Sequence, residues 1–328
     1  MDPRLIEVMK GARVPLGLNC RKGDQVVVVA DTDTEPLVWE AIAAAAFEVG
    51  GLPTVLIMLP LPFHHANPPA TVVGALRNAD LVVNVTSKGI AHSSVIEEIG
   101  KAGIRVISCE EVTADMLRSG AATADYEEME KLGKRVLEKW NNGSRVRVTS
   151  ELGTDLAASI QGRHGWMVAG KCAPLSQGSP ILRCAFPDGE AAVAPIEGTG
   201  EGIVVWDLTM ANIGAIREPI KGVFKKGRLV NIEGAQEANR LSQYLEQYGD
   251  QGAYNLAEIA IGLNPGVTPT GKVRTDKKLY GSVHVALGMN TDTGGGKNVS
   301  RLHIDGVIRK PTVYIDDQVV VEAGVIKV

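Results

Sequence analysis

Two polar side chains with the spacing of a chelate interrupt an apolar run near the end of the chain. His303 and Asp305 are two positions apart in the segment Leu302-His-Ile-Asp305. Residues with this spacing in a β-strand point to the same face. An imidazole and a carboxylate side by side can bind one divalent ion. The pattern is short, and a histidine in a strand can also be a satisfied core residue, but the pair predicts two metal ligands.

Two glutamates lie in or beside other apolar segments of the same half of the chain. Glu258 is the only charged residue in the segment 255–261. A carboxylate buried there is costly unless it is paired or binds a metal. Glu190 directly precedes a further predicted strand, in Asp188-Gly-Glu190. Either glutamate could instead pair with an arginine, so each is a candidate ligand rather than an assigned one.

A second histidine lies between valines in the segment Ser282-Val-His-Val-Ala286. His284 shares its strand face with Ser282 and Ala286, which are small enough to leave room for an ion or a substrate. Two histidines and three carboxylates on or beside apolar strands together favour a metal site over coincidence. Glu258 and His284 are also the predicted catalytic residues. The predicted metal ligands are Glu190, Glu258, His284, His303 and Asp305.

A glycine-rich segment, 294–300, directly precedes the His-x-Asp pair. It could form a simple hairpin turn, or a loop that touches substrate beside the metal. His92 is a further candidate because it precedes a predicted helix, and loops at the carboxyl ends of parallel strands bind ligands in open α/β sheets. The predicted substrate-binding residues are Lys297, Asn298, Ser300 and His92.

The elements that must position these residues fall into two patterns. The first ~145 residues alternate β-branched strands with helical segments, which predicts a largely parallel sheet covered on both faces. After the segment 140–144, short strands separated by turn residues predominate, with one clear helix over 234–248. We therefore expect an α/β domain over residues 1–143 and a β-rich α+β metal-binding domain over residues 144–328, facing each other across a cleft.

Composition and motifs exclude several classes of function. The formal net charge is −4 without a basic block, and aromatic residues make up only 4% of the chain, so nucleic acid is not an expected partner. The chain has no GxSxG elbow, no CxxC pair and no dinucleotide-binding loop. The N-terminal segment lacks the apolar run of a signal peptide. We expect a cytoplasmic homo-oligomer with a small-molecule substrate, no membrane partner and no organic cofactor.

Four ordered motifs of the C-terminal half resemble those of the aminopeptidase T family of metallopeptidases. They lie at residues 188–195, 257–265, 281–288 and 295–305. The resemblance implies that the five predicted ligands bind a pair of divalent metals. The same half also resembles 2,5-dihydroxypyridine dioxygenases, which are mononuclear iron(II) ring-cleaving enzymes of the same superfamily. This second resemblance rests on the segments 217–220, 237–241 and 314–324, and the chain length suits it better.

The chain departs from both families at positions that bear on the metal site. The dioxygenases are expected to carry histidine in place of Glu258 and serine near Ala286, so both differences favour the peptidase-like ligand set. The peptidases have an acid where this chain has Lys277, between Asp276 and Lys278. The loss of that acid argues against peptide hydrolysis.

We expect a metal-dependent hydrolase that acts on an amide bond of a small molecule or short peptide, with zinc, manganese or cobalt. Glu258 would then bridge ions or act as a base, and the metal would activate a bound water. The alternative is an extradiol-type iron(II) dioxygenase that opens a hydroxypyridine-type ring. In that case His303, Asp305 and one further group would form a facial triad with open positions for substrate and dioxygen.

Overall fold

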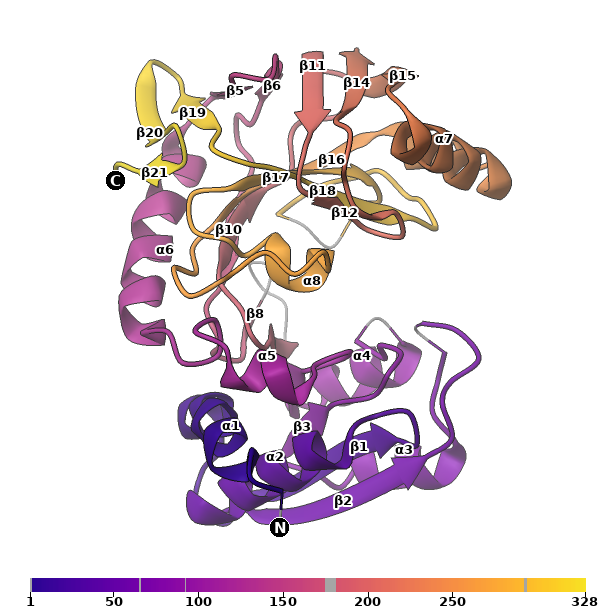
Figure 1. Ribbon diagram of the computed structural model, residues 1–328, viewed down its shortest axis with the longest axis vertical. Helices are drawn as coiled ribbons and strands as arrows, with labels where there is room; N and C mark the ends of the chain where they lie inside the picture. Colours follow the sequence, from indigo (N-terminus) through magenta and orange to yellow (C-terminus); the bar gives the residue numbers. More distant parts are fainter. Residues whose placement is uncertain (1, 65, 92, 175–180, 292–293) are drawn as a thin grey trace. The chain divides into compact units, whose positions relative to one another are not determined.

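The computed structural model shows two compact units, each described here by itself (Figure 1). It describes residues 2–64, 66–91, 93–174, 181–291 and 294–328. The first unit comprises residues 1–125 and 168–188, and the second comprises residues 126–167 and 189–328. The expected boundary at residues 143 and 144 thus lies inside the second unit, because helix α6 (Tyr126–Asn142) belongs to that unit.

The first unit is an α/β fold built on a six-stranded sheet. Valine-rich strands that are buried along most of their length form the middle of the sheet, as expected for parallel strands covered on both faces. The strand order is β2 (Leu52–Met58), β1 (Gln25–Asp31), β3 (Leu81–Asn84), β4 (Arg105–Ser108), β9 (Leu182–Ala185) and β8 (Ala173–Pro174). Its helices are α1 (Leu5–Asn19), α2 (Pro36–Glu48), α3 (Ala70–Leu76), α4 (Ser94–Lys101) and α5 (Ala114–Arg118).

Strand β9 differs from its sequence-based assignment. We expected the segment 181–186 to belong to the C-terminal domain because it follows the change of pattern near residue 144. Instead β9 extends the parallel sheet of the first unit, with Val106 of β4 opposite Arg183. The chain leaves this unit after α5 and returns to it at residue 168. A strand's sequence pattern fixes its burial but not its partner, which explains the difference.

The second unit contains two sheets that are built mostly of antiparallel strand pairs. One has the order β13 (Gly214–Ala215), β12 (Thr209–Met210), β18 (His303–Ile308), β17 (Val283–Gly288), β16 (Leu256–Gly262), β10 (Glu190–Val193) and β7 (Trp166–Val168). The other has the order β15 (Arg228–Glu233), β14 (Ile220–Lys225), β11 (Glu201–Trp206), β6 (Asp155–Ser159), β5 (Arg145–Thr149), β19 (Thr312–Ile315), β20 (Gln318–Glu322) and β21 (Val325–Ile326). Its helices include α7 (Gln236–Tyr248), α8 (Val273–Asp276) and the 3-10 helix η1 (Gln251–Tyr254).

A buried tryptophan ties the two sheets of the second unit together. Trp206 of β11 donates its indole N–H to the carbonyl of Val285 in β17, at 3.1 Å. A side chain at Gly306 of β18 would collide with the Trp206 ring, since its Cβ would lie 2.4 Å from Trp206 Cδ1. Packing against Trp206 therefore fixes the back of β17 and β18 and leaves their opposite face for other residues.

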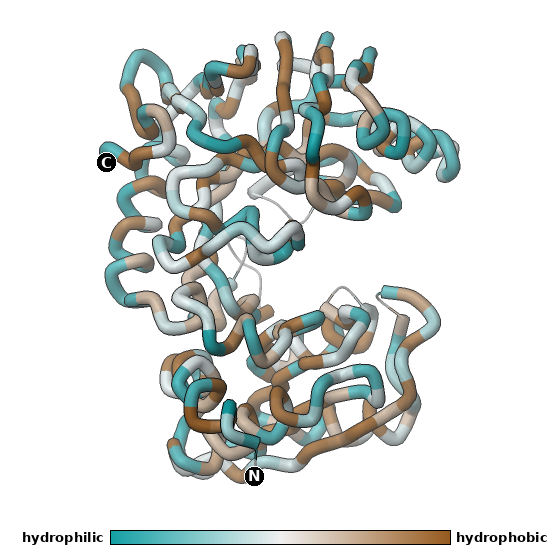
Figure 2. Tube along the Cα trace, viewed as in Figure 1, coloured by the Kyte–Doolittle hydropathy of each residue, from teal (hydrophilic) through white to brown (hydrophobic). Residues whose placement is uncertain are grey.

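Hydropathy follows this division into strands and covering helices (Figure 2). Hydrophobic residues recur along the strands of both units, and α7 is mainly hydrophilic outside its buried face. That face carries Ala238, Leu241 and Leu245, as the spacing of the apolar residues predicts. Within the described ranges, no helix combines the length and the apolar character needed to cross a bilayer.

Candidate metal centre

Three neighbouring strands of the seven-stranded sheet present four of the five predicted ligands on one face. Glu258 of β16 lies opposite Ala286 of β17, and Ala286 lies opposite Asp305 of β18, so the three form one row across the sheet. His284 and His303 are each two residues away from this row on their own strands, and they therefore share its face. The small Ala286 side chain leaves space between the two carboxylates.

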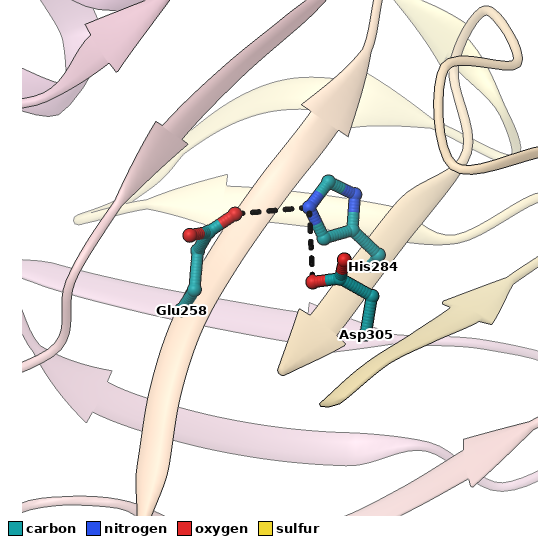
Figure 3. Close-up of side chains that lie close together, drawn as sticks. All are labelled: Glu258, His284 and Asp305. Carbon is teal, nitrogen blue, oxygen red and sulfur yellow. Dashed lines mark hydrogen bonds and ion pairs between the residues drawn. The ribbon is translucent and has the colours of Figure 1, made fainter. Parts of the chain in front are cut away.

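The ligand atoms of Glu258, His284 and Asp305 converge (Figure 3). Glu258 Oε1 lies 2.9 Å from His284 Nε2, and His284 Nε2 lies 3.9 Å from Asp305 Oδ1. His303 Nε2 lies 3.2 Å from Asp305 Oδ1 and 3.8 Å from Glu258 Oε2. One ligand atom from each of Glu258, His284 and Asp305 can be chosen so that all three lie within 4.8 Å of one another. The sheet thus brings four of the five predicted ligands around one point.

Glu190 reaches the same cluster from the next strand. It lies at the start of β10, opposite Gly262 of β16, which places it on the ligand face. Its Oε2 atom lies 3.6 Å from His284 Nε2. The missing side chain at Gly262 is required here, because a Cβ would lie only 2.1 Å from the carbonyl oxygen of Leu279. The segment that follows α8 can therefore run close over β16.

The two histidines are held differently. The carbonyl of Met289 can only accept, so His303 Nδ1 carries the proton of this 2.8 Å hydrogen bond and leaves Nε2 facing Asp305. Such an outer hydrogen bond orients the ring of a metal-binding histidine. His284 is completely buried, with Nε2 facing Glu258. His303 is more accessible, with 26% of its side chain exposed.

Two lysines that the sequence did not mark as site residues also enter the cluster. Lys277 Nζ lies 3.0 Å from Asp305 Oδ2 and 3.6 Å from Glu190 Oε2. Lys278 Nζ lies 2.7 Å from Glu190 Oε1. Both directly follow α8, which packs against β12 and β18. The available signal was the pair of consecutive lysines six and seven positions before His284, where the resemblance led us to expect an acid.

A buried aspartate fixes the segment that carries these lysines. Asp276 accepts hydrogen bonds from the backbone N–H groups of Thr270 and Gly271, at 2.7 and 2.9 Å. Its carboxylate also accepts from the hydroxyl of Thr209 in β12, at 3.1 Å. A carboxylate with these partners is satisfied by the protein itself and anchors the loop. Asp276 therefore positions Lys277 and Lys278 without taking part in the cluster.

The charges of the cluster shift one another's ionisation. Burial by itself would raise the pKa of Glu190, but Lys277 and Lys278 hold it at about 2. Burial would likewise raise the pKa of Asp305, but Lys277 and His303 hold it well below its usual range. Burial would lower the pKa of His303, but the neighbouring Asp305 raises it to about 10. In the metal-free protein at neutral pH, Glu190 and Asp305 are therefore ionised and His303 is protonated.

The residues present fit a divalent ion. Glu190 Oε2, which lies 3.6 Å from His284 Nε2, is buried and has no hydrogen-bond partner among the described residues, as expected where a charged partner belongs. Ligands about 2.1 Å from an octahedral ion lie about 3 Å apart. The separations of 2.9 Å between Glu258 and His284 and 3.2 Å between His303 and Asp305 are close to this value. The cluster can therefore hold a divalent metal through imidazole nitrogens and carboxylate oxygens.

Four residues were predicted to contact substrate, namely Lys297, Asn298, Ser300 and His92. Lys297 is exposed. Asn298 Nδ2 donates to the carbonyl of Gly288 at 2.7 Å, and Ser300 Oγ donates to Asp250 Oδ2 at 2.7 Å. These bonds hold the loop in place, and a substrate contact by any of the three stays a prediction. His92 lies outside the described residues.

Comparison with known proteins bears on the reaction. A family model described as 2,5-dihydroxypyridine 5,6-dioxygenase matches residues 16–328. The 2,5-dihydroxypyridine 5,6-dioxygenase of Pseudomonas putida strain KT2440 is 29% identical over 262 residues, which cover 76% of this chain and 71% of that protein.

Two solved structures share the fold over nearly the whole chain. The 2,5-dihydroxypyridine dioxygenase from Pseudomonas putida KT2440 has a TM-score of 0.75 at 23% identity, covering 99% of this chain and 96% of that one. AmpT from Thermus thermophilus has a TM-score of 0.73 at 17% identity, covering 99% of both chains. The resemblance to a superfamily that contains both kinds of protein is confirmed.

The expected main function is corrected by these matches. We expected a metal-dependent amide or peptide hydrolase, because the chain has Glu258 and Ala286 where the dioxygenases are expected to carry histidine and serine. That expectation is wrong, because the family model and the curated relative both bear the name of a dioxygenase. The likeness to AmpT is one of fold alone. The chain belongs to the 2,5-dihydroxypyridine 5,6-dioxygenase family.

Proposed function

We propose that the protein is an iron(II)-dependent dioxygenase that opens the ring of a hydroxypyridine-type aromatic compound. The observation that carries the proposal is the match of the dioxygenase family model to residues 16–328. That range includes every residue of the metal cluster. The name of the curated relative supports 2,5-dihydroxypyridine as the first substrate to test.

The ligand set of the proposed centre is His284, His303 and Asp305. Two imidazoles and one carboxylate on a single face form the facial triad of non-haem iron(II) oxygenases, which leaves positions open for other ligands. Asp305 Oδ1 lies 3.2 Å from His303 Nε2 and 3.9 Å from His284 Nε2, so one oxygen faces both imidazoles. Bound iron(II) would supply the capacity to bring dioxygen and an aromatic substrate together at one centre.

Glu258 has a separate role in the proposal. Its carboxylate lies on the opposite side of the cluster from Asp305, within 2.9 Å of His284 Nε2 and 3.8 Å of His303 Nε2. A buried carboxylate at that point can accept a hydroxyl proton from the substrate. With a metal bound, the hydrogen bond to the Met289 carbonyl would keep His303 in the tautomer whose Nε2 lone pair faces the cluster. Glu258 thus acts as a base, and Met289 acts as a positioning residue.

An oxygen electrode with a panel of metals tests the proposal. Metal-free protein is reconstituted without oxygen with iron(II), zinc, manganese or cobalt, and 2,5-dihydroxypyridine is then added together with dioxygen. We expect uptake of one dioxygen per substrate with iron(II) alone. Absence of uptake over a panel of hydroxypyridines, with iron bound at full occupancy, would contradict the proposal.

Two variants separate the assigned roles. Asp305→Asn should lose iron, because it removes the carboxylate that faces both imidazoles. Glu258→Gln should keep iron and lose most turnover, because the amide cannot accept the substrate proton. The matched control is Glu151→Gln, which changes an exposed glutamate in a turn. Full turnover by Glu258→Gln would remove Glu258 from the chemistry.

A further inference from the structure

The two lysines in the cluster are not explained by the proposed reaction. The side chains of Lys277 and Lys278 are only 18% and 4% exposed, and their ammonium groups lie among carboxylates rather than in solvent. Burying an ammonium group is costly unless it is paired. The loop anchored by Asp276 holds both lysines in position. The cost of burying two ammonium groups beside a metal centre indicates that they have a role there.

The donor groups alone could serve more than one ion. Three carboxylates and two imidazoles are more ligands than one ion with open positions usually takes from a protein. The carboxylates are those of Glu190, Glu258 and Asp305, and they bring three formal negative charges. The two lysines contribute two positive charges, which is as much as one divalent ion. With the lysines in place, the charge of the cluster leaves little need for a second ion.

The position of Lys277 is more specific than its charge. Asp305 directs Oδ1 to the two imidazoles and Oδ2 to Lys277 Nζ, at 3.0 Å. Lys277 Nζ is also 3.6 Å from Glu190 Oε2. In two-metal sites the ions lie about 3.5 to 4 Å apart and share bridging groups. Lys277 therefore lies where a second ion would share the Asp305 carboxylate with the first.

We propose that Lys277 is a built-in cation that occupies the second cation position of the centre and limits the protein to one divalent ion. This inference rests on the metal centre of the proposed function but not on its oxygen chemistry. Lys278 differs from Lys277, because its ammonium group lies 2.7 Å from Glu190 Oε1, whereas Lys277 approaches Glu190 Oε2 and Asp305 Oδ2. Lys278 supplies the same charge without the bridging position, so it provides the matched control.

Metal stoichiometry tests the inference independently of activity. Metal-free protein is titrated with manganese(II) without oxygen, bound metal is measured by elemental analysis, and electron paramagnetic resonance reports whether two ions are coupled. We expect the wild-type protein and Lys278→Met to bind one ion per chain. Lys277→Glu replaces the ammonium with a carboxylate and should bind two ions per chain, with the spectrum of a coupled pair.

A second variant allows the inference to be tested even if Lys277→Glu does not fold. Lys277→Met removes the ammonium without adding a charge, and it should also accept a second ion, at least tenfold more weakly than the first. One ion per chain in every folded variant, or two in the wild-type protein, would overturn the role of Lys277 and leave the metal centre intact. No bound ion in the wild-type protein would instead remove the metal centre of the proposed function, and this inference with it.

Discussion

The affinity of the centre for a divalent ion should rise with pH well beyond the range in which an ordinary histidine titrates. The effect of Asp305 outweighs that of burial and raises the pKa of His303 to about 10 in the metal-free protein, compared with about 6.5 for an unperturbed imidazole. An ion that binds Nε2 must displace this proton. The dissociation constant should therefore fall about tenfold per pH unit, which is about a hundredfold between pH 7 and 9.

The stability of the metal-free protein should change with pH in the opposite direction to the metal affinity. Because folding raises the pKa of His303, protonation of this residue stabilises the folded state. That stabilisation is complete below about pH 6.5 and is lost as the pH rises through about 10. The melting temperature of metal-free protein should fall across this window, and His303→Gln should remove that part of the dependence.

Chelator-buffered titrations with cobalt(II) at several pH values between 6.5 and 9 measure the affinity. The histidine resonances of the metal-free protein, followed by NMR, measure the pKa of His303 directly. A dissociation constant that becomes constant above pH 7, together with a His303 pKa below 7.5, would refute the reasoning. It would show that Asp305 does not raise the pKa of His303.

Two further substitutions test the framework of the site. Glu190→Gln removes the negative charge that lies 2.7 Å from the buried ammonium group of Lys278. It should lower the free energy of unfolding of the metal-free protein by about 3 to 5 kcal/mol, measured by urea denaturation. A loss below about 1 kcal/mol would contradict the pairing. Gly262→Ala forces a Cβ against the carbonyl of Leu279 and should cost about 1 to 3 kcal/mol. The control Gly74→Ala, in a helix with open space around it, should be neutral or stabilising by up to about 1 kcal/mol.

The metal cluster could be anticipated from the sequence because strand geometry is local. A spacing of two places His303 and Asp305 on one face wherever the strand lies. The buried character of the segments around Glu258 and His284 indicated that both needed a partner. The structure adds the register that aligns Glu258, Ala286 and Asp305 in one row. Register depends on contacts between distant segments, so spacing alone could not supply it.

The lysines could not be assigned from the sequence for a physical reason. Lysine is usually solvated, and nothing local to residues 277 and 278 shows that the loop turns their ammonium groups inward. That orientation depends on Asp276 bonding to Thr209, which is distant in sequence. The sequence therefore indicates three carboxylates near the metal but not the two ammonium groups that neutralise them, and carboxylates alone favour two metal ions and a hydrolase. Including Lys277 and Lys278 makes the same site suitable for one ion.

Isotope labelling provides the most direct test of the proposed reaction. Iron(II)-reconstituted protein is supplied with 2,5-dihydroxypyridine under oxygen-18 gas, and the product is analysed by mass spectrometry. We predict that both atoms of one dioxygen molecule appear in a ring-opened product. A product that carries oxygen only from water, or that forms equally well without dioxygen, would contradict the assignment of this protein as a dioxygenase.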